Sequence, residues 1–203
     1  GNVIFPGAVI SAVPQDLKFQ GEDTTAEVGD NNKIRENVTI NRGTAAKGKT
    51  CVGSGNLLME SVHVAHDAFV GNDCIIGNGT KLAGEIIIDD HAIISANVLM
   101  HQFCRVGGYT MVGGGTRFSQ DIPPYTICAR EPVAYCGLNL VGLRRRGFSN
   151  ELIENIHNAY RIIYQGGVPL NEALQKVREE VPASPEINYI IEFIENSKRG
   201  FVH

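Results

Sequence analysis

The stretch from Val52 to Pro123 repeats every six residues, and this period constrains the fold more than any other feature of the sequence. An apolar residue opens each of twelve consecutive hexads, and a small residue usually follows it. The opening residues are Val52, Leu58, Val64, Val70, Ile76, Leu82, Ile88, Ile94, Met100, Val106, Val112 and Phe118. A helix with about 3.6 residues per turn would scatter these side chains around its circumference, so it could not bury them on one side.

Short strands joined by tight turns can use a period of six. Three such strands form one triangular coil, and parallel pairing stacks successive coils about 4.8 Å apart. The apolar residue of each hexad then points into the prism, while the small residue after it allows the chain to turn. Hexapeptide periodicity is a known signature of the parallel β-helix. The sequence therefore predicts a mainly β protein, with a β-helix over residues 1–125.

The register extends toward the N-terminus, with two interruptions. Val28, Ile34 and Ile40 form one further coil, and only Ile4 and Ile10 precede them in phase. The chain thus starts inside a coil, and because open parallel edges invite association, we expect more coils upstream. Residues 14–27 and 41–51 break the period and are predicted to be loops at the surface, serving either as binding loops or as plain insertions.

The period fails after Phe118, where Pro123 and Pro124 cannot donate to a ladder. Residues 126–147 are predicted to be a linker. Apolar residues at helical spacing predict three helices, at 150–164, 171–180 and 185–197, with Ser149 and Ser184 as N-caps. Residues 148–203 would then form a C-terminal helical domain that closes the end of the prism.

Composition excludes several classes of protein. The net charge of −4 argues against a general nucleic-acid binder. None of the five cysteines forms a C-x-x-C pair, so no zinc or other metal site is expected. Cys74 and Cys104 fall where a hexad needs a small buried residue, and we interpret them as reduced core thiols. No run of 18 apolar residues is present, so we expect a cytoplasmic protein without stable membrane insertion.

Polar, titratable residues gather on one of the three predicted faces, on successive coils. A histidine can take a proton from a hydroxyl, and a neighbouring carboxylate can orient it, so the group suggests general-base catalysis. Any single member could instead be a solvated residue that points outward. We place His63 at the corner just before this face and the others on it. The group consists of His63, His66, Asp67, Glu85, His101 and Gln102.

A flat prism face is a poor pocket, whereas two faces from neighbouring subunits make a cleft. Prisms of this kind pack around a threefold axis, so we expect a trimer with shared sites. The run Arg144-Arg145-Arg146 precedes the first predicted helix. It is either solvated or in contact with a phosphate-bearing substrate or an acidic carrier protein.

Several longer motifs carry a resemblance to a known family. They are Gln15-Asp16-Leu17-Lys18, Ile34-Arg35-Glu36, Arg42-Gly43-Thr44, Asn56-Leu57-Leu58-Met59, His63-Val64-Ala65-His66-Asp67, Leu82-Ala83-Gly84, His101-Gln102-Phe103 and residues 142–148. Over essentially its whole length the sequence resembles UDP-N-acetylglucosamine O-acyltransferase, which catalyses the first step of lipid A synthesis. The resemblance implies a homotrimeric left-handed β-helix with active sites between subunits. It also implies transfer of an (R)-3-hydroxyacyl chain from acyl carrier protein to the 3-hydroxyl of the UDP-sugar, without a cofactor.

The resemblance also implies roles for individual residues. His66 matches the general base, Asp67 orients it, and the backbone N–H of Gly84 matches the donor to the thioester oxyanion. Gly114 matches the position where residue size limits acyl length, and its lack of a side chain favours a longer chain. The residues that match substrate-binding or site-lining positions are Asp16, Lys18, His63, Glu85, His101, Gln102, Asn139, Arg145 and Arg146.

Three positions depart from the family pattern. Asn41 and Glu85 stand where the family often has His, and Val141 stands where it often has Glu. The acceptor could therefore be a 3-amino UDP-sugar. Three rival activities also stay open at this point. They are the related UDP-3-O-acylglucosamine N-acyltransferase, an acetyl-CoA-dependent acetyltransferase, and a zinc enzyme whose ligands would be His63, His66 and His101.

Overall fold

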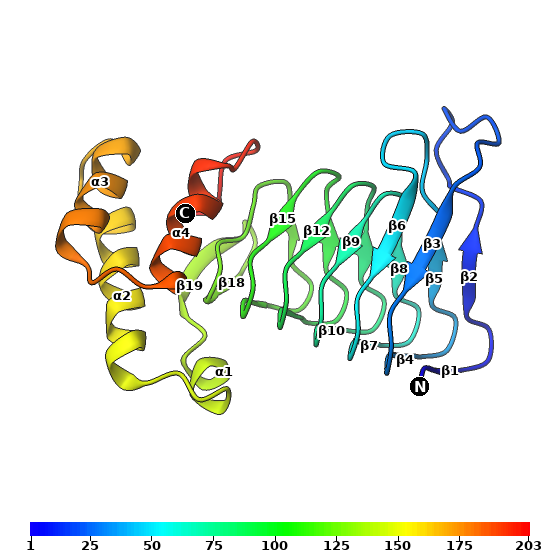
Figure 1. The fold of residues 1–203 in the computed structure, drawn as a ribbon, viewed down its shortest axis with the longest axis horizontal. Coiled ribbons are helices and arrows are strands. Elements are labelled where there is room, and N and C mark those ends of the chain that lie inside the picture. The colour runs from blue at the N-terminus through cyan, green and yellow to red at the C-terminus, as the bar shows by residue number, and fades with distance from the viewer.

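Three parallel sheets form the sides of a triangular prism that makes up most of the chain (Figure 1). The computed structural model describes residues 1–203 without a gap. Each coil contributes one short strand to each sheet, so paired residues in neighbouring strands are one whole coil apart in sequence. The predicted left-handed parallel β-helix of hexapeptide repeats is confirmed.

The strands are assigned to the three faces as follows. The first face contains β3 (Thr25–Val28), β6 (Lys49–Val52), β9 (Phe69–Val70), β12 (Ile87–Ile88) and β15 (Arg105–Val106). The second face contains β1 (Val3–Ile4), β4 (Lys33–Ile34), β7 (Leu57–Leu58), β10 (Ile75–Ile76), β13 (Ile93–Ile94), β16 (Met111–Val112), β18 (Thr126–Ala129) and β19 (Ala134–Leu138). The third face contains β2 (Val9–Ala12), β5 (Thr39–Asn41), β8 (His63–Val64), β11 (Lys81–Leu82), β14 (Leu99–Met100) and β17 (Arg117–Phe118).

The residues that open the hexads form the core of the prism. All twelve of them, from Val52 to Phe118, are at most 6% exposed, so every one points inward as the period predicts. Cys74 and Cys104 are also fully buried and unpaired, as the sequence indicated. Burial raises the pKa of the Cys74 thiol to about 12 and that of the Cys104 thiol to about 11. Both therefore stay protonated at neutral pH and act as small apolar side chains.

The two predicted loops leave the prism at the same corner, between the third and first faces, and lie side by side at its N-terminal end (Figure 1). They are shorter than the sequence suggested. The segments that lead from the two loops back into the prism are β3 and β6. These strands pair in parallel over four residues, from Thr25↔Lys49 to Val28↔Val52. Because these strands are longer than the two-residue strands of a regular hexad, the six-residue period did not reveal them.

Residues 126–147 are not a simple linker, which corrects the prediction. They contain β18, β19 and the short helix α1 (Leu140–Arg145). Strand β18 adds one more parallel strand to the second face next to β16, and β19 turns back antiparallel to β18. The hexad spacing has already ended here, so the six-residue pattern carried no signal for these strands.

The C-terminal domain contains the three predicted helices, α2 (Asn150–Gln165), α3 (Leu170–Glu180) and α4 (Pro185–Glu195). The Ser149 and Ser184 hydroxyls accept hydrogen bonds from the backbone N–H groups of Leu152 and Ile187, which confirms both N-caps. The helices and the chain leading into them share a second hydrophobic core. No helix is both long enough and apolar enough to cross a membrane.

Candidate active site

A chain of hydrogen bonds links His66, Asp67 and Thr44 at the corner between the third and first faces. Nδ1 of His66 lies 2.9 Å from Oδ2 of Asp67. The same carboxylate accepts hydrogen bonds from the Thr44 hydroxyl at 2.6 Å and from the Thr44 backbone N–H at 2.9 Å. Thr44 belongs to the loop between β5 and β6, so this loop helps to fix the carboxylate. Asp67 is only 1% exposed, and its position is therefore well defined.

The electrostatics of this pair set the tautomer of the histidine. Burial raises the pKa of Asp67, but the hydrogen bonds from the Thr44 hydroxyl, from His66 and from the Thr44 N–H outweigh it and hold the pKa below its ordinary value. The carboxylate is thus ionised at neutral pH and can only accept, so Nδ1 of His66 carries the proton. In the neutral imidazole this tautomer leaves the lone pair on Nε2.

Gly84, one coil further along, lies directly against the His66 ring. A Cβ atom at this position would be 2.6 Å from Cε1 and 2.7 Å from Nε2 of His66. Only glycine permits this close approach. The Gly84 N–H donates no hydrogen bond to any acceptor within the chain, although the residue is buried. The site therefore places a free backbone donor beside the free nitrogen of His66.

His63 lies within β8, on the third face itself, which corrects its predicted position at the preceding corner. Its Nδ1 lies 2.7 Å from the Thr39 hydroxyl. Burial lowers the pKa of His63, and the charges of Lys81 and His66 lower it further. His63 is therefore neutral at pH 7 and available for hydrogen bonding.

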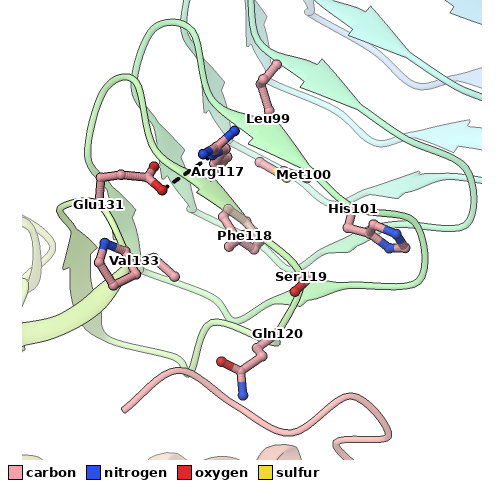
Figure 2. Close-up of a pocket in the computed structure, with 10 residues that line it drawn as sticks. Leu99, Met100, His101, Arg117, Phe118, Ser119, Gln120, Glu131 and Val133 are labelled. Carbon is pink, nitrogen blue, oxygen red and sulfur yellow. Dashed lines mark hydrogen bonds and ion pairs between the residues drawn. The ribbon is translucent and has the colours of Figure 1, made fainter.

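Two adjoining cavities lie along the third face. A cavity of about 310 Å³ is lined by His63, His66, Lys81 and Gly84, and Gln15 from the first loop closes one side. A second cavity, of about 560 Å³, lies nearer the helical domain, and His101 is part of its lining. At the end of this cavity opposite His101, Arg117 forms an ion pair with Glu131 at 3.3 Å (Figure 2). Both cavities have Leu99 and Met100 in their lining, so they adjoin along the third face, and together we call them the groove.

Most of the predicted site residues lie close to this groove. Glu85 follows Gly84 and forms a long ion pair with Lys47, at 3.8 Å. His101 is exposed, and its Nδ1 lies 3.1 Å from the Gln102 carbonyl oxygen. In the first loop, Oδ1 of Asp16 accepts a hydrogen bond from the backbone N–H of Lys18 at 3.0 Å.

A second group of predicted site residues lies elsewhere on the same chain. Asn139 caps α1, and the exposed Arg145 and Arg146 stand at its C-terminal end. Arg146 lines a separate cavity of about 470 Å³ over the second face, together with Lys33, Leu57 and Ile75. Gly114 lies between the second and third faces, and a Cβ there would meet only the Ala96 carbonyl oxygen, at 3.3 Å, and the Ser95 Cβ, at 3.7 Å. One chain therefore does not bring these residues together with His66.

Sequence reasoning missed several residues that shape the groove. Thr39, Lys81 and the Thr44 hydroxyl were not assigned a role, although Thr44 stands in the Arg42-Gly43-Thr44 motif. Of the departures from the family pattern, Asn41 is 2% exposed and donates to the Val13 carbonyl oxygen at 3.2 Å, and Val141 is exposed. Within the chain, no group of three His, Cys, Asp or Glu residues could hold a metal ion.

Comparison with known proteins identifies the family. A protein-family model, described as UDP-N-acetylglucosamine O-acyltransferase, domain 2, matches residues 121–202. The LpxA structure from Bacteroides fragilis, described as a UDP-N-acetylglucosamine acyltransferase, is 74% identical and superposes with a TM-score of 0.98. The match covers 100% of this chain and 80% of that one. The chain belongs to the UDP-N-acetylglucosamine acyltransferase family.

More distant members of this family share the whole fold. The enzyme of Moraxella catarrhalis is 42% identical with a TM-score of 0.95, and the match covers 100% of this chain and 79% of that one. The LpxA of Acinetobacter baumannii is 38% identical with the same TM-score of 0.95 and the same two coverages. The family predicted from the sequence motifs is confirmed, and the protein is an acyltransferase.

Proposed function

We propose that this chain transfers an (R)-3-hydroxyacyl group from acyl carrier protein to the 3-hydroxyl of UDP-N-acetylglucosamine, the first step of lipid A biosynthesis, with His66 as the general base. One observation carries the proposal: a buried, ionised Asp67 holds Nδ1 of His66 at 2.9 Å, and the ring lines the groove. This arrangement leaves Nε2 free to accept a proton from a hydroxyl in the groove.

The transfer proceeds directly from donor to acceptor, and the chain needs no cofactor for it. The sugar hydroxyl attacks the thioester carbonyl carbon while Nε2 of His66 takes its proton. The Gly84 N–H, which has no partner in the chain, donates to the oxyanion that forms. The C–S bond then breaks, and the leaving thiolate takes the proton from the imidazolium of His66. General-base assistance of this kind is typically worth about 10²–10⁴-fold in rate.

Two subunits supply the substrate contacts in this proposal. Near His66, the groove residues are Asp16, Lys18, His63, Glu85, His101 and Gln102. A neighbouring copy supplies Asn139, Arg145 and Arg146, since these lie on another part of the same chain. Arginine suits a nucleotide diphosphate or the phosphate-linked acyl group of the carrier. Gly114 leaves space for a long acyl chain.

An apolar ladder on the outside of the second face supports a homotrimer. Its outward residues pair in register from one strand to the next and are only half-buried within the chain. A prism with one apolar outer face can bury it by threefold packing. The same packing brings a second copy close to the groove. The ladder residues are Leu57, Ile75, Ile93, Met111 and Ile127.

A 3-amino UDP-sugar is the second candidate acceptor. Glu85 places a carboxylate beside Gly84, and its ion pair with Lys47 is long, at 3.8 Å. Oδ1 of Asn41 is buried and accepts no hydrogen bond. A carboxylate and a free amide oxygen are both suited to an amine.

Acyl transfer followed by mass spectrometry tests both candidates. The wild-type protein, His66→Ala and the control His157→Ala are each mixed with a set of 3-hydroxyacyl carrier proteins and both UDP-sugars. His157 is an exposed histidine of α2, far from the groove in sequence and structure. We expect an ester on UDP-N-acetylglucosamine from the wild type and from His157→Ala, and almost none from His66→Ala. An amide as the main product would instead identify the amino-sugar acceptor. A folded His66→Ala variant with a near-normal rate would refute the role of His66.

A further inference from the structure

One edge of the prism, between the first and second faces, carries bulky residues where the backbone turns through a left-handed conformation. Asp73, His91, Tyr109 and Tyr125 occupy this corner on successive coils, with φ values of 53°, 62°, 59° and 66°. The preceding two coils use Asn31 and Gly55 there, at 57° and 73°. Glycine and asparagine adopt this conformation readily, whereas tyrosine adopts it at a cost in free energy. The tyrosines therefore invite an explanation through their side chains.

The aromatic rings along this edge form a continuous stack that leads into the helical domain. The Tyr109 ring lies 4.7 Å from the His91 ring and 5.6 Å from the Tyr125 ring, measured between centroids. Phe148, just before α2, meets Tyr109 edge-on at 5.1 Å, and Tyr189 of α4 meets Tyr125 at 5.9 Å. Pairs of this geometry favour one fixed arrangement beyond simple burial.

Tyr109 also contacts two residues that the proposed function assigns to substrate. Its carbonyl oxygen accepts a hydrogen bond from Nδ2 of Asn139 at 2.9 Å. Its ring lies 5.9 Å from Cζ of Arg146. Arg146 forms no ion pair, its guanidinium donates no hydrogen bond within the chain, and Tyr109 provides the aromatic ring that it lies over. A guanidinium at this distance from an aromatic face is attracted to it.

We infer that Tyr109 is a positioning residue that holds Arg146, through its ring, in the orientation used for substrate. The inference rests on the proposed role of Arg146. The Tyr109 hydroxyl makes no hydrogen bond in the structure, so the ring and not the hydroxyl is the part that matters. The left-handed corner fixes where the ring stands, and the stack with Tyr125 and Phe148 fixes its plane.

Two substitutions at Tyr109 separate ring, hydroxyl and backbone. Tyr109→Phe keeps the ring and removes only the unbonded hydroxyl, so it should retain KM within about twofold of wild type. Tyr109→Asn suits a left-handed corner and keeps the carbonyl that binds Asn139, but it removes the ring. Arg146→Ala identifies the substrate that depends on Arg146, because it raises the KM for that substrate. For the same substrate we expect Tyr109→Asn to raise KM about tenfold, with a smaller change in kcat. Both substrates, UDP-N-acetylglucosamine and the acyl carrier protein, are titrated for each variant.

The double variant decides whether Tyr109 acts through Arg146. In the Arg146→Ala background, Tyr109→Asn should change KM less than twofold, because the ring no longer has a guanidinium to hold. The inference would be overturned if Tyr109→Asn raised KM tenfold in both backgrounds. It would also be overturned if Tyr109→Phe raised KM as much as Tyr109→Asn does. A raised KM in Arg146→Ala together with a normal KM in Tyr109→Asn would also overturn it, yet leave the proposed function standing. A normal KM in Arg146→Ala would overturn the inference and the proposed role of Arg146, yet leave the proposed transfer reaction standing.

A second test does not depend on the folding of Tyr109→Asn. Arg146 is exposed, so Arg146→Lys is expected to fold normally. Lysine keeps the charge but lacks the planar group that stacks on an aromatic face. We expect Arg146→Lys to raise KM almost as much as Arg146→Ala does. A wild-type KM for Arg146→Lys would contradict a role for the ring contact.

Discussion

The carboxylate of Asp67 lies between the ring of His66 and the hydroxyl of Thr44, at 2.9 Å from Nδ1 and 2.6 Å from Oγ1. The two donors come from different coils, because Thr44 belongs to the loop between β5 and β6. The loop therefore does more than cover the corner, because it positions Asp67, which in turn positions His66. Contacts of this kind around a reacting group keep its orientation defined before substrate arrives.

Removing the Thr44 hydroxyl should lower stability, most clearly at neutral pH, where Asp67 is ionised. The pKa of Asp67 is held below its ordinary value, so its contribution is complete above a pH of about 4 and is lost as the pH falls through the lowered pKa. In Thr44→Val the carboxylate loses one donor, its pKa rises, and the free energy of unfolding at pH 7 should fall by about 1–3 kcal/mol. Urea unfolding at pH 7 and an acid titration followed by circular dichroism measure the two effects.

Thr110→Val provides the matched control for that experiment. The Thr110 hydroxyl is buried and donates to the Pro123 carbonyl oxygen at 2.8 Å, where no ionisable group is involved. Its loss of stability should be the same at every pH. For an equal loss at pH 7, its acid midpoint should therefore shift further than that of Thr44→Val, whose loss shrinks in acid. If both variants shifted the acid midpoint equally for equal loss at pH 7, the hydrogen bond from Thr44 would not be what lowers the pKa of Asp67.

Adding a single methyl group at Gly84 should disable the site without unfolding the prism. The Cβ atom of Gly84→Ala would stand 2.6 Å from Cε1 of His66, and the ring, held by Asp67, would have to move. A displacement of about 1 Å at a catalytic group can cost about 10²-fold in rate. We expect a fall of that size in kcat, measured by product formation, with a melting temperature near that of the wild type. An Ala variant with normal kcat would show that close approach at Gly84 is not needed.

The prism could be predicted from sequence because its periodicity is local and strict. Each hexad repeats one strand, one inward residue and one corner, so Val52 and Phe118 obey the same rule although they are 66 positions apart. The positions of His66 and Gly84 on adjacent coils follow directly from that register. Their contact does not, because nothing in the spacing indicates that the imidazole turns toward Gly84 and excludes a Cβ atom there.

Features that depend on longer strands or on partners from other coils could not be read from the period. The pairing of Thr25–Val28 with Lys49–Val52 requires both loops to leave the same corner. Strand β18 continues the second face after the hexads have ended. The contact between Tyr109 and Asn139 joins a corner of the prism to the residue that caps α1, 30 positions later. Motif resemblance named Asn139 as a site residue, but only the structure shows which residue holds it.

A charge on the apolar ladder of the second face should dissociate the assembly and abolish transfer together. Ile93 lies in the middle of this ladder, between Ile75 and Met111. In Ile93→Glu a carboxylate would be buried against another copy, which costs several kcal/mol unless it is paired. We expect a trimer for the wild type and a monomer with little activity for the variant, as measured by light scattering coupled to size exclusion.

Ile87→Glu is the control for this change. Ile87 is the corresponding outward residue of β12 on the first face and is also half-buried. It should remain trimeric and active if the second face is the interface. A monomeric Ile87→Glu beside a trimeric Ile93→Glu would assign the interface to the first face and contradict the shared site as proposed.

Filling the space at Gly114 should shorten the acyl chain that the protein prefers. A Cβ at Gly114 meets nothing closer than the Ala96 carbonyl oxygen at 3.3 Å, and its φ lies outside the left-handed region, so a side chain can be added with little strain. In Gly114→Met the thioether would extend into the volume assigned to the end of the chain. A mixture of 3-hydroxyacyl carrier proteins of graded length, analysed by mass spectrometry, gives the preference within a single reaction. We expect the longest products to fall by about tenfold or more, since each buried methylene contributes about 0.8 kcal/mol, while the shorter products continue to form and serve as the internal control. An unchanged distribution of lengths would place the end of the acyl chain away from Gly114.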